Sequence, residues 1–69
     1  MRSDEARQAL ERLAAGRACY MTRQDWLYEK ASAWKPLFLV GVRVQEGTFA
    51  LGEGATWEDA VSELAGKLA

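Results

Sequence analysis

The chain has 69 residues, with nine Lys and Arg, ten Asp and Glu, and a net charge of -1. It has no His and one Cys, which excludes an internal disulfide and a zinc site of Cys and His within one chain. Its longest apolar stretch, 37–42, is far below the about 20 residues of a membrane-spanning helix, and no signal-peptide pattern opens it. We expect one domain, residues 1–69, that is cytoplasmic (in the host cytoplasm if phage-encoded), without metal, cofactor or membrane.

The first predicted element is a helix over residues 4–15. Ser3 is a good N-cap, Asp4 and Glu5 suit the positive end of the helix dipole, and Gly16 is a natural stop. Five apolar residues then fall on one stripe: Ala6, Ala9, Leu10, Leu13 and Ala14.

A second helix is predicted over residues 23–33. Thr22 and Asp25 are spaced as a near capping box, and Leu27 begins an apolar face that continues at i+4 and i+7. Pro36 restricts the residue before it to extended geometry, so the helix should end there. Residues 17–21 fit either a short third strand or an extended connector.

Residues 37–44 predict a strand. Phe38, Val40, Val42 and Val44 would lie on one face, and Leu37, Leu39, Gly41 and Arg43 on the other. A two-residue turn at Glu46–Gly47 would join it to a return strand over 48–51. That register places Val44 opposite Phe49 and Val42 opposite Leu51. The first half of this strand is apolar on both faces, so that half is expected to be covered on both sides, and a second subunit is one candidate for the cover.

The last predicted helix spans residues 57–67. Thr56 and Asp59 repeat the near capping box, and Glu63 and Lys67 are spaced for an i,i+4 ion pair. The predicted fold is a small α+β domain of order α-α-β-β-α, with its helices packed on one face of an antiparallel hairpin.

Residues Val42 to Leu64 resemble the hairpin and helix of HicB-type antitoxins. The stretch combines the hairpin with the segment Gly54-Ala55-Thr56-Trp57-Glu58-Asp59-Ala60-Val61. The resemblance covers about a third of the chain and implies a hairpin followed by a helix. It transfers no functional residue.

No catalytic group can be assembled from the residue types present. Cys19 has no His to activate it, so we expect a thiol that is either buried or idle. The adjacent acids at 4–5 and 58–59 are explained by the first turns of two helices. Residues 52–54 match no phosphate-binding motif and are interpreted as a turn. We therefore expect no enzymatic activity.

The aromatic residues suggest an interface. Three Trp, two Tyr and two Phe are many for 69 residues, and a monomer this small cannot bury every side chain of 26–34. A domain of this size is also marginally stable alone, so we expect a homodimer. The expected partner-binding residues are Trp26, Tyr28, Lys30, Trp34 and Lys35, with Arg43, Gln45 and Glu46 at the hairpin edge as a second surface.

The expected function is that of a small non-enzymatic protein that binds and blocks a larger host protein or complex. Its general character fits a phage or mobile-element accessory protein, such as an anti-CRISPR-like or other inhibitor of host defence or host machinery. The alternative is a small nucleic-acid-binding transcriptional regulator or an antitoxin. Nucleic acid would then meet Arg7, Arg12, Arg17, Arg23 and Lys30, against a net charge that is unusual for such proteins.

Overall fold

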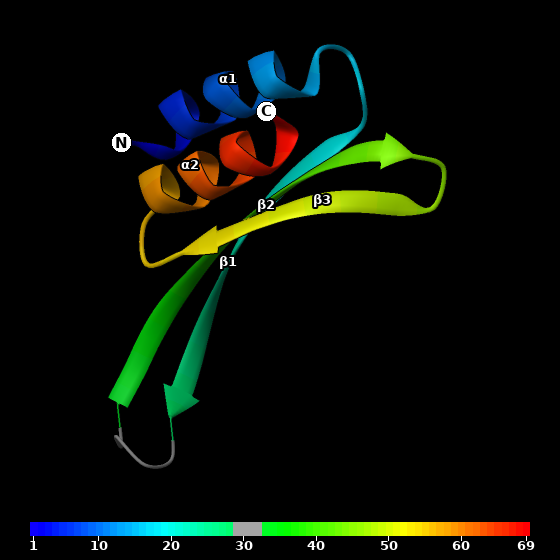
Figure 1. Cartoon of the computed structure of the whole chain (residues 1–69). Coiled ribbons are helices and arrows are strands. Elements are labelled where there is room, and N and C mark those ends of the chain that lie inside the picture. Colours follow the sequence, from blue (N-terminus) through cyan, green and yellow to red (C-terminus); the bar gives the residue numbers. More distant parts are fainter. Residues whose placement is uncertain (29–32) are drawn as a thin grey trace.

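The computed structural model describes residues 1–28 and 33–69, and only the backbone for 25–28 and 33–36. Its elements are α1 (Ser3–Ala14), β1 (Cys19–Tyr28), β2 (Ala33–Gln45), β3 (Thr48–Gly54) and α2 (Trp57–Leu68). The strands form one antiparallel sheet of order β1-β2-β3, and both helices pack on the same face of it (Figure 1). The predicted α+β class, with helices on one face of an antiparallel sheet, is confirmed.

The predicted helix over 23–33 is wrong. Residues as far as Tyr28 belong to β1 and β2 begins at Ala33, while residues 29–32 lie outside the described part of the chain. The strand considered for 17–21 does form, from Cys19, and continues as far as Tyr28, within the segment assigned to the helix. The local capping signal at Thr22 is overridden because β1 pairs with β2 along its whole length.

The hairpin register also differs from the prediction. Phe49 lies opposite Arg43, and Leu51 lies opposite Gly41, because the pairing shifts at a β-bulge between Arg43 and Gln45. A one-residue shift turns every following side chain of β3 to the other face. The bulge therefore places Phe49 and Leu51 on the face away from the helices.

The ends of the helices largely follow the sequence signals. Helix α1 begins at Ser3 itself, and its N-cap is Arg2, whose amide donates to Glu5 Oε1 at 3.0 Å. The prediction that Ser3 caps this helix is therefore wrong by one residue. For α2 the prediction is confirmed: Thr56 Oγ1 accepts the amide of Asp59 at 3.0 Å.

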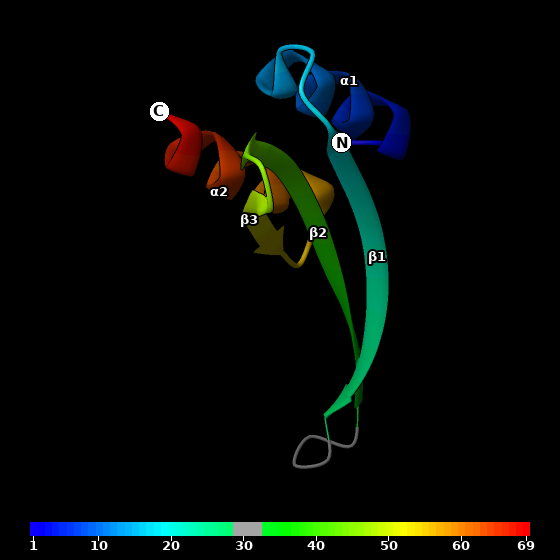
Figure 2. The ribbon, with the colours of Figure 1, turned by 90° about the vertical axis from the view of Figure 1, so that its right-hand side faces the viewer.

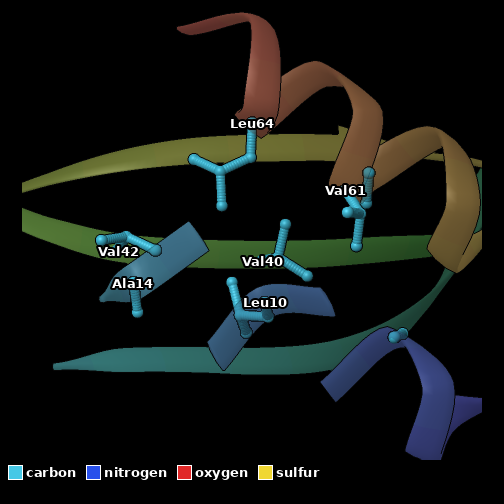
Figure 3. Close-up of a cluster of buried hydrophobic side chains, with 8 residues drawn as sticks. Leu10, Ala14, Val40, Val42, Val61 and Leu64 are labelled. Carbon is cyan, nitrogen blue, oxygen red and sulfur yellow. The ribbon is translucent and has the colours of Figure 1, made fainter. Parts of the chain in front are cut away.

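The core lies between the two helices and the central strand. Among the described residues, the buried apolar side chains come from α1, β2 and α2, and they converge in Figure 3. They are Ala6, Leu10, Ala14, Val40, Val42, Ala60, Val61 and Leu64. Helix α2 lies close to β3 because Gly52 has no side chain: a Cβ there would collide with the carbonyl oxygen of Ala60 and lie 2.7 Å from the amide of Leu64.

Strands β1 and β2 continue beyond the end of β3 as a two-stranded ribbon. The last β3 pairing joins Phe38 to Gly54, whereas β1 and β2 pair as far as Tyr28 and Ala33. This ribbon, residues 24–28 and 33–37, runs away from both helices (Figures 1 and 2). It explains a radius of gyration of 12.7 Å, against about 11 Å for a compact chain of this length.

Pro36 is tolerated inside β2 because of where β3 ends. The amide of Arg43 bonds to Ala18 beside β1, so odd-numbered residues of this part of β2 direct their amides toward β1. Even-numbered ones face the side of β3, and Pro36 lies past the last β3 pairing. The amide hydrogen that proline lacks would have no strand partner at that point.

Among the described residues, no helix combines the length and the apolar character that crossing a membrane requires.

Candidate functional site

The sheet face opposite the helices is the first candidate surface. We call it the open face and define it by residues Tyr20, Thr22, Leu39, Gly41, Arg43, Phe49, Leu51 and Glu53, which alternate with the helix-side residues. Tyr20 and Leu51 are each 41% exposed and Phe49 is 39% exposed. Exposed large apolar side chains gathered on one face are typical of an interaction surface.

The apolar side chains of the open face pack against one another. A Cβ at Gly41 would lie 3.1 Å from Leu51 Cδ2 and even closer to the Tyr20 ring, so the glycine leaves the space that these side chains fill. The Tyr20 and Phe49 rings meet edge to face with centroids 5.7 Å apart, and the Arg43 guanidinium lies 5.9 Å from the Phe49 ring centre. These contacts hold the surface in shape before any partner arrives.

Two opposite charges lie at the two ends of the open face. Arg43 shares a row with Phe49, and Glu53 shares a row with Leu39. The row of Tyr20, Gly41 and Leu51 lies between them. The open face is therefore apolar in the middle, positive at one end and negative at the other.

The ribbon is the second candidate surface, and it holds four of the predicted partner-binding residues. Trp26 lies opposite Lys35, and Tyr28 and Trp34 occur in the next two rows of the same ribbon. The fifth residue predicted in this segment, Lys30, lies outside the described residues.

The predicted second surface is separate from the ribbon. Gln45 ends β2 and Glu46 is in the following turn, at the opposite end of β2 from the ribbon, and both are exposed. Arg43 is exposed as well and belongs to the open face. The structure thus divides the predicted contact residues between two ends of the molecule.

An aromatic cluster fixes the base of the ribbon to helix α2. Phe38 and Trp57 meet edge to face with ring centroids 4.7 Å apart. On the β1 side, the Arg23 guanidinium lies 5.4 Å from the Phe38 ring centre. These contacts join β1, β2 and the first residue of α2 where the ribbon leaves the body of the domain.

Two of the arginines considered for nucleic-acid binding have local structural roles. Arg17 Nε donates a hydrogen bond to the carbonyl of Ala14 at 2.8 Å. It thereby provides a partner for one of the carbonyls at the end of α1 that have none within the helix. Arg7 pairs with Glu11 at 3.6 Å on the exposed surface of α1. Arg12 is exposed on the same helix. Arg23 contributes to the base of the ribbon, as described above.

The described residues offer little for a cofactor or a metal. No group of three or more Cys, Asp and Glu within 1–28 and 33–69 is arranged to hold a metal ion. Cys19 is a free, partly buried thiol packed against the core. An open hollow of about 250 Å³ lies beside Ser3, Asp4, Arg7 and Met21, lined by charges of both signs.

The open-face residues Tyr20, Leu39, Phe49 and Leu51 were not among the predicted contact residues. One signal was present, because 37–43 alternates with apolar residues on both faces. The positions of Phe49 and Leu51 could not be predicted in this way, because regular pairing without the bulge would place both on the helix side. The signal that finds them is the need for small residues beneath α2, at Gly52 and Gly54.

No family model, no curated protein and no solved structure matches this chain.

Proposed function

We propose that this chain is a non-enzymatic protein-binding protein that docks on a larger protein through its ribbon and blocks a surface of that protein. One observation supports this above the others: β1 and β2 leave the three-stranded sheet as a two-stranded ribbon that runs away from both helices (Figure 2). A host protein as the target, and an origin in a phage or mobile element, belong to the same proposal.

A bound partner would stabilise the ribbon. Two strands alone are marginally stable in water, and β3 and the helices do not extend along this part of the sheet. The sequence places Trp26, Tyr28 and Trp34 on it. Trp and Tyr are the residue types most enriched at binding hot spots. A partner that covers the ribbon would add the missing stabilisation.

The base of the ribbon favours ordered docking. The Arg23, Phe38 and Trp57 contacts connect both ribbon strands to α2, so the ribbon leaves the domain from a fixed point. An element presented from a rigid base loses less conformational entropy when it binds. Association through the ribbon should therefore depend on the intact domain rather than on the ribbon sequence alone.

Nucleic-acid binding is the weaker alternative. The first turn of α2 presents the acidic residues Glu58 and Asp59. Arg7 and Arg17 already bind groups of the same chain, Glu11 and the carbonyl of Ala14. A phosphate backbone would meet a chain of net charge -1. Protein binding and nucleic-acid binding would respond differently to salt, because binding to phosphates weakens steeply as the salt concentration increases.

The test is a capture experiment with matched variants. Tagged wild-type chain, a Trp26→Ser/Trp34→Ser ribbon variant and a Gln8→Ser control on exposed α1 are incubated with host lysate, treated with nuclease and washed in high salt. We expect one complex to be enriched by the wild type and the control but not by the ribbon variant.

The captured protein is then purified and titrated against all three chains. We expect the ribbon variant to bind at least about tenfold more weakly than the control. Equal affinities for all three chains would contradict the proposal, as would capture that disappears with nuclease. Circular dichroism of each variant verifies that the fold is retained.

A further inference from the structure

The open face has a self-complementary arrangement of charge. We propose that it is covered by a second copy of this chain, with the two sheets packed face to face about a two-fold axis. The helices would then lie on the outside of the dimer and the ribbons would stay available. This inference concerns a different surface from the proposed function and does not depend on it.

The charges are the first argument for a second copy. Arg43 and Glu53 lie on the same face but about 14 Å apart along the strands, too far to pair within one chain. A two-fold axis that lies in the interface and crosses the strands near Leu51 exchanges the two ends of the face. Arg43 of each copy then lies over Glu53 of the other. Such a reciprocal pairing is the property of an isologous interface.

The centre of the face provides the apolar contact. Tyr20, Phe49 and Leu51 are each about two-fifths exposed in the single chain, and Leu39 is partly buried beside them. Two such faces meeting at about 10 Å would interdigitate these side chains, as in other packed sheets. The apolar side chains of the two copies then meet each other at the axis.

The dimensions of the face set the strength of the dimer. Three strands spaced about 4.8 Å apart, and five residues at about 3.4 Å each along a strand, give a face roughly 14 Å wide and 17 Å long. That is below the size of standard specific interfaces and falls in the range of weak, transient ones. We therefore expect a dissociation constant in the micromolar range rather than an obligate dimer.

Pairing through the edge of β3 is disfavoured by an observed contact. Lys67 Nζ donates to the carbonyl of Leu51 at 2.7 Å and lies 3.3 Å from Glu63. The acceptor that an added strand would use is therefore already bound to a lysine of the same chain. A second copy that paired with this edge would have to displace the lysine, which the packing of two open faces does not require.

The test is a charge exchange followed by sedimentation velocity from about 5 to 500 μM. We expect the wild type to dimerise, and Arg43→Glu and Glu53→Arg each to weaken dimerisation at least about tenfold, because each variant faces like charges. An equimolar mixture of the two variants should form a heterodimer with near wild-type affinity. The double variant R43E/E53R should form a homodimer again.

A second pair of variants tests the apolar centre. Leu51→Lys should abolish dimerisation, whereas Ser62→Lys, the same added charge on exposed α2, should leave it unchanged. A monomeric wild type at 500 μM would overturn the proposal. So would single charge variants that dimerise like the wild type, or a mixture that fails to associate. If Leu51→Lys instead removes only the binding of a different protein, the face belongs to that partner.

The dimerisation experiment and the capture experiment of the proposed function can succeed or fail independently. The Trp26→Ser/Trp34→Ser variant should dimerise like the wild type even where it fails to capture a partner. Urea unfolding at low concentration, where every variant is monomeric, verifies that each fold is intact.

Discussion

At the scale of single residues, the glycines of β3 and α2 show how strongly a missing side chain shapes this fold. At Gly52 the backbone of β3 approaches the backbone of α2, and the neighbouring atoms belong to Ala60 and Leu64. Backbone atoms cannot move aside as the end of a flexible side chain can. Gly66 has open space around it on the exposed side of α2.

The same substitution should therefore have opposite effects at these two positions. Gly52→Ala should lower the free energy of unfolding by about 2–4 kcal/mol, because α2 must move away from β3. Gly66→Ala should raise it by about 0.5–1 kcal/mol, since alanine loses less backbone entropy in a helix. Urea denaturation of both variants measures the two changes. A Gly52→Ala protein as stable as the wild type would contradict the close packing of α2 on β3.

At the scale of elements, the free edge of β3 is protected by helix α2. Lys67 reaches from the last turn of the helix to the carbonyl of Leu51 and holds it at 2.7 Å. Exposed strand edges are templates for intermolecular pairing, and a lysine at the edge is a common protection against it. The ion pair with Glu63 orients the same ammonium group.

Removal of this lysine should both destabilise the domain and expose the edge. We expect Lys67→Met to lower the free energy of unfolding by about 1 kcal/mol and to increase aggregation on prolonged incubation. Glu63→Gln is the matched control, since it removes the exposed ion pair and keeps the bond to Leu51, for a loss of about 0.5 kcal/mol or less. Urea denaturation and light scattering follow the two effects. Equal aggregation of both variants would show that the edge contact has no protective role.

The sequence predicted the helices and the strands of this fold with different success. Helices α1 and α2 were predicted nearly residue for residue, because caps such as Thr56 and the 3–4 residue spacing are local signals. The length of β1 and the register at Arg43 depend on pairing with residues far along the chain, which no local pattern contains. The segment after Thr22 shows this: its helical signals are real but weaker than the pairing with β2.

The candidate surfaces were predictable to a similar degree. Composition predicts Trp26 and Trp34 as contact residues, but assigns them to one helix, whereas they lie on strands β1 and β2. The open face was missed, because the bulge that exposes Phe49 and Leu51 cannot be deduced from alternation. Arg43 was predicted as a contact residue, and the structure places it at the end of that face.

At the scale of the whole molecule, β2 belongs to two regions of different stability. Its middle, at Val40 and Val42, lies beneath both helices and is fully buried. Its first part, up to Leu37, pairs with β1 alone. Local opening costs less where few contacts must be broken, so one continuous strand should unfold in two steps.

Native-state hydrogen exchange measures this difference directly. We expect the amide of Val40 to exchange at least about a hundredfold more slowly than that of Leu37, at a protein concentration where the chain is monomeric. The amide of Arg43, bonded to Ala18 at 2.8 Å beyond the buried centre, should fall between them. Identical protection at all three positions would mean that the ribbon and the body open as a single unit.

The bulge between Arg43 and Gln45 has a consequence for how the hairpin avoids a competing structure. Regular pairing would turn Phe49 and Leu51 toward α2 and would turn Gly52 away from it. That competing hairpin is attractive by itself, because it places two large apolar side chains on the inner face. Helix α2 cannot dock on it, since the space beside Ala60 and Leu64 admits only a glycine. The helix therefore acts as a steric filter on the strand register, and excludes the hairpin that simple hydrophobic collapse would favour.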